Sequence, residues 1–348
     1  MPRIELPISK SIANRLLILQ AIHGDGQLLT VSADMPDDVQ VMSEAIRLVG
    51  ESQEARIDLG NCGTAMRFLT AYCAQLEGQT TIMDGVERMR HRPIGQLVDA
   101  LREIGADIEY LGEEGFPPLR IKGCILDKHR IVIIDNPQST QFVSALLLIG
   151  ANVQTDSTSP YITLTHKLIQ HYTTLHHSTR HYTIEKDWSS AAFWYEYVAL
   201  HGGEIKLPGL HKESLQGDKV VADIFAHLGV STQYTEDGIQ ICCSQTILNS
   251  KFLIQNFIAC PDLYPAVALT CERLGITLHA TGTESLSIKE SDRIRAVREH
   301  LTDHDHRMAM ALLIAGYEVD DTACISKSYP QFLEQWQAIQ TSSPENLR

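Results

Sequence analysis

One unit recurs along the chain: residues with a helical period, a glycine where that period ends, and then a short alternating strand. The clearest copies run from 93 to 110 and from 216 to 241, and a shorter echo spans 37 to 50. In each copy the glycine follows the last apolar position, where a left-handed cap ends a helix. Helices that alternate with short strands predict an α/β or α+β fold, in which each helix packs on its own small sheet.

The length of 348 residues predicts two domains rather than one. The connectors between the repeated units differ strongly, which argues against a solenoid of short repeats. Turn residues between 207 and 214 favour one domain crossing there, and the second crossing is expected near Leu6 and Pro7. We therefore expect a discontinuous domain of residues 1–8 plus 212–348 and an inserted domain of residues 9–211.

The composition excludes several classes of protein. No apolar stretch reaches the roughly 18 residues that a membrane span needs, and the first residues resemble no signal or transit peptide, so a cytoplasmic location is expected. The eight cysteines form no Cys-x-x-Cys pair, which predicts reduced thiols. A net charge of −14 disfavours binding to nucleic acids or anionic membranes. Local cationic clusters in such an acidic chain indicate small anionic ligands.

Two further sequence features narrow the chemistry. Residues 166–181 hold five histidines, but their spacing matches no familiar ligand set, so we interpret the tract as a polar helix and loop rather than a metal site. The chain has no P-loop, no Gly-x-Gly-x-x-Gly fingerprint and no nucleophile elbow. P-loop kinases, dinucleotide enzymes and serine hydrolases are therefore disfavoured.

Three polar segments precede apolar helical patterns. They are Ser9-Lys10-Ser11, Gly60-Asn61-Cys62-Gly63-Thr64 with Arg67 one turn later, and Pro137-Gln138-Ser139-Thr140-Gln141. Each alone is explained by ordinary helix capping or a tight turn. Free backbone N–H groups at a helix start also suit an anion, and glycines let a ligand approach the backbone closely. Three such starts in one chain indicate bound phosphate or carboxylate groups.

The densest charged run, Ser287 to Arg295, precedes another helical pattern. Ser291 and Asp292 are candidates for a helix cap there. Glu290 in this run and Asp262 are the candidates for acid and base, because carboxylates in unlike surroundings can divide these roles. His306 is a further candidate, although a single histidine is often only a helix-end or surface residue.

The ordered motifs resemble those of the 5-enolpyruvylshikimate-3-phosphate synthase family, and they extend from Leu6 to Phe332. The matching segments are Ser9-Lys10-Ser11-x-x-Asn14-Arg15, Gly60-Asn61-x-Gly63-Thr64-Ala65-Met66-Arg67, Arg92-Pro93-Ile94-Gly95, Lys289-Glu290-Ser291-Asp292-Arg293 and Asp305-His306-Arg307-Met308-Ala309. The resemblance implies two domains, each of three βαβαββ units in an inside-out α/β barrel, with the active site in the cleft between them. It also implies a monomer with no metal and no organic cofactor.

The resemblance implies a reaction as well. The 5-hydroxyl of shikimate 3-phosphate would attack C2 of phosphoenolpyruvate while C3 is protonated, and the adduct would then release phosphate. Asp262 is expected to be the base at the hydroxyl, and Glu290 with Lys10 to move the proton at C3. The implied shikimate 3-phosphate residues are Lys10, Ser11, Arg15, Ser139, Thr140, Gln141, Asp262 and Lys289. The implied phosphoenolpyruvate residues are Lys10, Gly63, Arg92, Gln141, Arg293, Arg307 and Lys327.

The chain also departs from the family pattern. It is shorter than a typical member, and Ile8 stands where the family usually has glycine, which predicts a more restricted backbone there. Two alternatives stay open at this point. One is the related UDP-N-acetylglucosamine enolpyruvyl transferase, whose reactive loop cysteine has a loose counterpart in Cys124; we interpret Cys124 as an ordinary thiol at a strand end. The other is a catalytically degenerate relative that binds anions without turnover.

Overall fold

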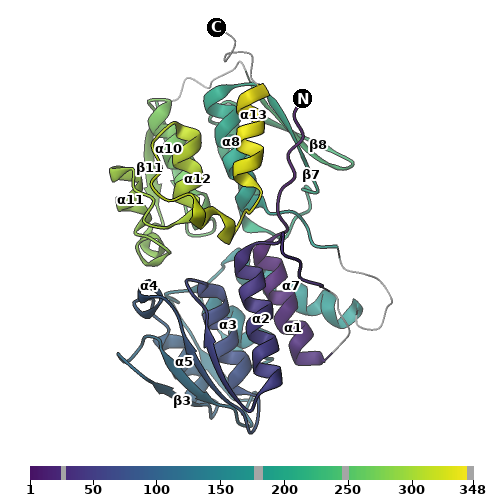
Figure 1. The fold of residues 1–348 in the computed structure, drawn as a ribbon, viewed down its shortest axis with the longest axis vertical. Coiled ribbons are helices and arrows are strands. Elements are labelled where there is room, and N and C mark those ends of the chain that lie inside the picture. The colour runs from purple at the N-terminus through teal and green to yellow at the C-terminus, as the bar shows by residue number, and fades with distance from the viewer. Residues whose placement is uncertain (25–28, 176–182, 245–250, 343–348) are drawn as a thin grey trace. The chain divides into compact units, whose positions relative to one another are not determined.

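A computed structural model describes residues 1–24, 29–175, 183–244 and 251–342. Helices and short strands alternate throughout, as the recurring pattern predicts (Figure 1). The chain divides into two compact units, which we describe separately. Unit 1 holds residues 1–10, 34–37 and 184–348, and unit 2 holds residues 11–33 and 38–183. None of the helices in the described ranges is long and apolar enough to cross a membrane.

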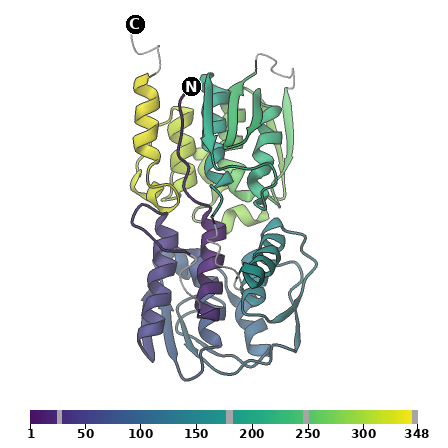
Figure 2. The same cartoon turned by 90° about the vertical axis from the view of Figure 1, so that its right-hand side faces the viewer.

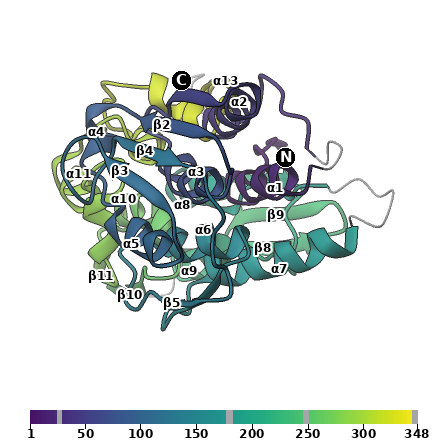
Figure 3. The ribbon, with the colours of Figure 1, turned by 90° about the horizontal axis from the view of Figure 1, so that it is seen from below.

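Unit 2 is built around one complete βαβαββ copy. Strands β1 and β2 pair in parallel, β4 pairs antiparallel with both β2 and β3, and the sheet order is β1-β2-β4-β3. Helices α3 and α5 pack against this sheet, whose labelled strands are seen in Figure 3. A second, shorter βαβ unit consists of β5, α6 and β6, in which the two strands pair in parallel. The elements that lie mainly in unit 2 are α1 (Lys10–His23), α2 (Asp37–Glu51), β1 (Glu54–Asp58), α3 (Gly63–Ala74), β2 (Thr80–Asp84), α4 (Glu87–Arg90), α5 (Gly95–Glu103), β3 (Asp107–Tyr110), β4 (Leu119–Lys122), β5 (Ile131–Ile133), α6 (Thr140–Leu148), β6 (Asn152–Gln154) and α7 (Pro160–Leu175).

Unit 1 surrounds a core formed by α8, α10 and α12, which pack on one another. An antiparallel sheet of order β7-β9-β8 and a parallel pair β10-β11 complete it. Its elements are α8 (Trp188–His201), β7 (Glu204–Pro208), the 3-10 turn η1 (Gly217–Val220), α9 (Val221–Ala226), β8 (Val230–Thr235), β9 (Gly238–Cys243), β10 (Phe252–Asn256), η2 (Pro261–Leu263), α10 (Tyr264–Arg273), β11 (Thr277–Thr281), η3 (Glu284–Ile288), α11 (Arg293–Glu299), α12 (His306–Ala315), η4 (Ala323–Lys327) and α13 (Phe332–Ser342).

Two of the three expected helix-exit glycines have the left-handed backbone that a cap requires. Gly105 has a φ of 101° after α5, and Gly229 has a φ of 86° after α9. The third prediction was wrong, because Gly50 lies inside α2, which continues to Glu51. The described residues do not show three βαβαββ units in each domain, because the sheets β5-β6 and β10-β11 have two strands each there.

The boundary between the units differs from the predicted one. Unit 1 resumes at Ile184 rather than at 212. The reason is that α8 packs on α10 and α12, and β7 pairs with β9, so residues 188–208 belong to the same core as the C-terminal half. Turn residues between 207 and 214 mark a connection within unit 1 and not a crossing between units.

The first ten residues are tied to the C-terminal half of the chain. Arg3 forms a parallel bridge with Lys206 in β7, beside which the purple N-terminal segment runs in Figure 2. Tyr329 and Gln335 both donate hydrogen bonds to the carbonyl oxygen of Glu5, at 3.2 and 2.9 Å. Ile8 forms an antiparallel bridge with Lys186. A β-branched residue suits this extended pairing, so the backbone at position 8 does not require glycine.

Candidate functional site

Arg293 is the centre of a buried ion-pair cluster in unit 1. Its side chain is 1% exposed and contacts three carboxylates: Asp262 at 2.7 Å, Asp305 at 2.8 Å and Glu290 at 3.2 Å. Burial opposes the charged guanidinium, but the three carboxylates outweigh it and raise its pKa. The cluster therefore gathers the two carboxylates and one of the cations that the sequence singled out.

Asp262 lies in η2 and is surrounded by cations. Besides Arg293, its carboxylate lies 3.2 Å from a guanidinium nitrogen of Arg307 and 3.5 Å from the Lys289 ammonium. Burial by itself would raise the pKa of Asp262, but Arg307, Lys289 and Arg293 together hold it well below its usual value. Asp262 is therefore ionised at neutral pH and available to accept a hydrogen bond.

Glu290 connects the cluster to η4. One carboxylate oxygen contacts Arg293, and the other lies 3.2 Å from the ammonium of Lys327, the last residue of η4. Glu290 is 11% exposed and Lys327 is 12% exposed, so this edge of the cluster reaches solvent. A ligand with negative charge at this edge would meet Lys327.

The caps of α11 and α12 fix the cations. Asp292, rather than Ser291, caps α11 by accepting from the Arg295 backbone N–H, whereas Ser291 donates its hydroxyl to Asp305. Asp305 is 0% exposed and caps α12 by accepting from the backbone N–H of Arg307 at 2.9 Å. The same carboxylate holds the Nε of Arg293. Our sequence interpretation assigned no role to Asp305, although it begins the Asp-His-Arg-Met-Ala segment.

His306 and Lys10 lie close to this cluster. His306 is 1% exposed, and neither ring nitrogen makes a hydrogen bond within the described residues. Burial and the charges of Lys10, Arg307 and Lys327 lower the pKa of His306 well below its usual value, so its ring is neutral at pH 7. Lys10, at the start of α1, thus contributes its positive charge to the same site.

Two more buried carboxylates lie near the cluster, and sequence analysis missed both. Asp187 caps α8, accepting from the Ser190 backbone N–H at 2.8 Å, and Asp218 in η1 accepts from the Ser189 hydroxyl. Burial, with help from the charge of Asp262, raises the pKa of Asp218 to about 7. The signal for Asp187 was available in the sequence, since Asp directly before an apolar helical pattern is a preferred N-cap residue.

In unit 2, Arg15 is a buried cation whose hydrogen-bond partners are neutral. Its guanidinium donates to the Thr165 hydroxyl at 2.7 Å, the Ser11 carbonyl at 2.8 Å and the Ser144 hydroxyl at 3.1 Å. It also stacks over the ring of Phe68, 5.1 Å from the centroid. Burial lowers the pKa of Arg15 to about 10, which still leaves it charged at neutral pH. An anion beside this guanidinium would offset the cost of burying its positive charge.

Gly63 is the first residue of α3 and lies against two guanidinium groups. A Cβ at this position would come within 2.3 Å of Arg67 Nη1 and 2.5 Å of Arg92 Nη1. Arg67 also donates to the Gly63 carbonyl at 2.9 Å and lies over the ring of Phe142 in α6, 5.9 Å from the centroid. A side chain at this position would therefore displace both guanidinium groups, whereas the backbone here has no left-handed angle that favours glycine.

The third polar segment caps α6. The Ser139 hydroxyl accepts from the Gln141 backbone N–H at 3.4 Å, so the capping interpretation is confirmed for this serine. The amide oxygen of Gln141 is buried and makes no hydrogen bond within the described residues. Thr140 and Gln141 are half-buried beside the start of the helix. Arg15 of α1 lies over the ring of Phe68 in α3, and Arg67 of α3 lies over the ring of Phe142 in α6, so side chains link these three helices.

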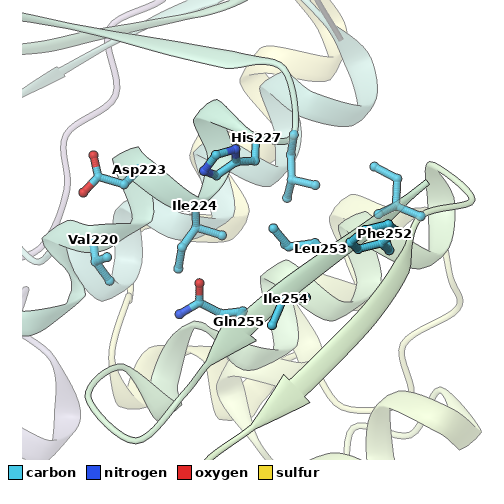
Figure 4. A pocket seen from close by; sticks show the side chains of 10 residues that line it. Val220, Asp223, Ile224, His227, Phe252, Leu253, Ile254 and Gln255 are labelled. Carbon is cyan, nitrogen blue, oxygen red and sulfur yellow. The ribbon is translucent and has the colours of Figure 1, made fainter. Parts of the chain in front are cut away.

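Other candidates lie elsewhere. His166 and His171 are exposed on α7, and His176, His177 and His181 lie outside the described residues. Cys124 follows β4 and donates its thiol to the Gly105 carbonyl at 3.2 Å, consistent with an ordinary strand-end thiol. A pocket of about 360 Å³ lies between α9 and β10, where Ile224 and Leu253 point toward one another (Figure 4). None of its lining residues belongs to the Arg293 cluster or to the sites around Arg15 and Gly63.

Comparison with known proteins identifies the family. A family model described as EPSP synthase (3-phosphoshikimate 1-carboxyvinyltransferase) matches residues 2–303 and 299–336. The chain belongs to the EPSP synthase family. Among EPSP synthase relatives, the 3-phosphoshikimate 1-carboxyvinyltransferase of Bacteroides fragilis strain YCH46 is 38% identical over 389 aligned residues, covering 94% of this chain and 93% of that protein. The enzyme of the same name from Erwinia tasmaniensis is 32% identical over 418 aligned residues, covering 95% and 94%.

The fold is also that of solved EPSP synthases. The structure of EPSP synthase from Acinetobacter baumannii superposes with a TM-score of 0.65 and 19% sequence identity, covering 97% of this chain and 95% of that one. The prediction of the family and of a mixed α/β fold is therefore confirmed. Two members of the Arg293 cluster, Arg293 and Glu290, come from the Lys-Glu-Ser-Asp-Arg motif, and the structure brings Asp262 to them.

Proposed function

We propose that this chain transfers the enolpyruvyl group of phosphoenolpyruvate to the 5-hydroxyl of shikimate 3-phosphate and releases phosphate. The family match and the names of the curated relatives support this reaction and do not favour the UDP-N-acetylglucosamine alternative. The observation that carries the assignment of roles is the Arg293 cluster, in which an ionised Asp262 and a solvent-reaching Glu290 are held among several cations.

We assign phosphoenolpyruvate to the residues that the family resemblance implies for it. Its phosphate and carboxylate need several positive charges. Lys327 supplies one at the edge of the cluster that reaches solvent, and Arg307 supplies another beside Asp262. Gly63 allows the close approach that packs two guanidinium groups around the start of α3. The proposed phosphoenolpyruvate residues are Lys10, Gly63, Arg92, Gln141, Arg293, Arg307 and Lys327.

We assign the second substrate to an overlapping set. Arg15, charged and held by neutral partners, suits the carboxylate of shikimate 3-phosphate. The start of α6 suits its phosphate, because hydroxyls and backbone N–H groups gather there. The proposed shikimate 3-phosphate residues are Lys10, Ser11, Arg15, Ser139, Thr140, Gln141, Asp262 and Lys289.

In the proposed chemistry, the oxygen of the 5-hydroxyl forms a bond to C2 of phosphoenolpyruvate while its proton passes to Asp262. A proton is added at C3, giving a tetrahedral adduct that still carries phosphate. Loss of a proton from C3 and cleavage of the C2–O bond to phosphate then give the product. We assign the proton transfers at C3 to Glu290 with Lys10, and the cations stabilise the anionic adduct.

Substrate binding would also tune the base. Without ligand, Arg307, Lys289 and Arg293 hold the pKa of Asp262 low, which makes it a weak base. When a phosphate or carboxylate draws these cations toward itself, their effect on Asp262 weakens and its basicity rises. The hydroxyl would then be deprotonated most readily when both substrates are bound.

A phosphate-release assay tests the proposal. Purified protein is mixed with phosphoenolpyruvate and either shikimate 3-phosphate or UDP-N-acetylglucosamine. We expect phosphate release with the first acceptor only. Release with the second acceptor would favour the alternative transferase, and binding of phosphoenolpyruvate without release in either mixture would indicate a degenerate relative.

The role of Glu290 is tested by Glu290→Gln, with Glu299→Gln as the matched control on the exposed face of α11. We expect Glu290→Gln to lower kcat by about 100-fold or more, the size typical of a lost acid–base group, while both substrates still bind. Glu299→Gln should keep the wild-type kcat. A near-normal kcat in Glu290→Gln would remove this residue from the proton transfer.

We further infer a monomer that works in the cytoplasm, with small molecules rather than nucleic acids or membranes as its partners. The resemblance to the family supports this inference. Light scattering on the eluting protein should give a mass close to the 38.8 kDa of one chain. A mass of twice this value would contradict the monomer.

A further inference from the structure

The loop between α11 and α12 has an unusual backbone. Three of the four non-glycine residues with positive φ in the described chain lie there: His300 at 52°, Asp303 at 46° and His304 at 57°. Left-handed backbone is unfavourable for residues with a side chain and persists where surrounding contacts hold it. The contacts of this loop therefore indicate what its shape is needed for.

Two side chains tie the loop to the segment that precedes η4. The hydroxyl of Thr302 donates to Asp320, and the ring Nδ1 of His304 lies 2.6 Å from the Asp321 carboxylate, to which it donates. The backbone N–H of Asp305 donates to the Thr302 carbonyl at 2.8 Å. The loop is thus fixed both to its neighbour and to the residue that caps α12.

Each end of this connection leads to a cation of the Arg293 cluster. The other carboxylate oxygen of Asp321 accepts from the backbone N–H groups of Ala323 and Cys324, at 2.9 and 3.3 Å, and so fixes the start of η4, which ends at Lys327. On the loop side, Asp305 holds the backbone of Arg307. His304 and Asp321 therefore link the two segments that deliver Arg307 and Lys327.

We propose that His304 is a positioning residue for phosphoenolpyruvate. Its contact with Asp321 holds the loop before α12 and the turn η4 in fixed positions relative to each other, so that Arg307 and Lys327 can contact the same ligand. The contact is strongest when His304 is protonated, which makes this alignment depend on pH. The inference rests on the proposed phosphoenolpyruvate role of Arg307 and Lys327.

The charged groups that act on His304 are acidic. Asp321 makes the direct contact, and Asp320 and Asp303 add negative charge from the segment before η4 and from the loop itself. The hydrogen bond to Asp321, with these charges, raises the pKa of His304 above its usual value. The protonated contact is therefore present below the ordinary histidine pKa of about 6.5 and is lost as the pH rises through the raised pKa. His304 is 84% exposed, so its effect on binding is modest.

The test compares His304→Asn with the wild type between pH 6 and pH 9, with shikimate 3-phosphate saturating. Asparagine tolerates the left-handed backbone but cannot carry a charge. We expect the KM for phosphoenolpyruvate of the variant to exceed that of the wild type by about threefold at pH 6, the size that an exposed ion pair carries. The ratio should fall toward one at pH 9, while kcat and the KM for shikimate 3-phosphate stay within about 1.5-fold.

Three further variants separate positioning from a general structural effect. Asp321→Asn keeps an oxygen to cap η4 but loses the charge, and it should reproduce the pH-dependent ratio. The double variant should be no worse than either single one, because both remove the same contact. His227→Asn, at an exposed position on another helix end of unit 1, should give a ratio of one at every pH.

A ratio that does not change with pH, or additive effects in the double variant, would overturn the proposal. Absence of phosphate release by the wild type at every pH would instead count against the proposed function. Thermal melting curves of the variants confirm folding, and a shift common to His304→Asn and His227→Asn would show that the change is unspecific.

Discussion

Glu196 lies within α8 and is completely buried at 0% exposure. Neither carboxylate oxygen has a hydrogen-bond partner within the described residues. A charged carboxylate in such surroundings is strongly unfavourable, and burial raises the pKa of Glu196 well above its usual value. Glu196 is therefore protonated in the folded protein at a pH where the unfolded chain has released the same proton.

This difference fixes the size of the effect. Because the native state binds one proton more than the unfolded state, the free energy of unfolding falls as the pH rises above the unfolded pKa of Glu. The slope is about 1.4 kcal/mol per pH unit for one proton, until the pH reaches the native pKa. Glu196→Gln removes the proton but keeps the shape. We expect the two proteins to have similar free energies of unfolding near pH 4.5. Between pH 5.5 and 6.5 the advantage of the variant in free energy of unfolding should grow by about 1.4 kcal/mol.

Urea unfolding of both proteins, followed by tryptophan fluorescence at pH 5.5, 6.0 and 6.5, measures the difference. Trp188 and Trp194 lie in the same helix and report on the core around Glu196. Glu236→Gln, at an exposed hairpin between β8 and β9, is the matched control and should show no change with pH. A gain for Glu196→Gln that stays constant over this range would refute a protonated Glu196.

Four further predictions concern the clusters. Gly63→Ala should fold with little change in Tm but raise the KM for phosphoenolpyruvate by about tenfold or more, because its Cβ displaces two guanidinium groups, as steady-state kinetics would show. Arg15→Lys loses the forked contact with two hydroxyls and should raise the KM for shikimate 3-phosphate by about tenfold while sparing that for phosphoenolpyruvate. Arg293→Met leaves three carboxylates facing one another, and urea unfolding should show that the free energy of unfolding falls by about 3–5 kcal/mol. An unchanged free energy of unfolding would contradict the place of Arg293 at the centre of the cluster. Asp218 loses its proton near pH 7, so the affinity for phosphoenolpyruvate should fall from pH 6 to 8, and Asp218→Asn should flatten that profile in direct binding experiments.

The sequence was most informative where a motif is local. The run from Lys289 to Arg293 could be recognised as a charged segment at a helix start, and the structure confirms that Glu290 and Arg293 contact each other three residues apart. Asp262 was chosen as one of two carboxylates that could divide the roles of acid and base, and it comes within 2.7 Å of Arg293 across 31 positions of sequence. Periodicity likewise predicted α5 and α9 together with the glycines that end them.

The sequence was least informative where burial decides the role. Asp187, Asp218 and Glu196 look like ordinary acidic residues in the sequence, and only the packing of α8 and η1 shows that they are buried. The boundary of unit 1 was misplaced for a similar reason. Turn residues mark where the chain bends, but only the contacts of α8 with α10 and α12 show which core the preceding segment joins. Non-local packing of this kind leaves no periodic signal.

The tie between the first residues and the last helix has a consequence for synthesis on the ribosome. Glu5 is held by Tyr329 and Gln335, and Arg3 pairs with β7, so the N-terminal segment has no native partner until most of the chain has been made. Residues 38–183, by contrast, contain a complete sheet and its covering helices. Domains generally fold as units while the chain emerges. Residues 1–8 thus wait for partners made much later, and a nascent chain halted near residue 320 would hold a folded unit 2 and an unfinished unit 1.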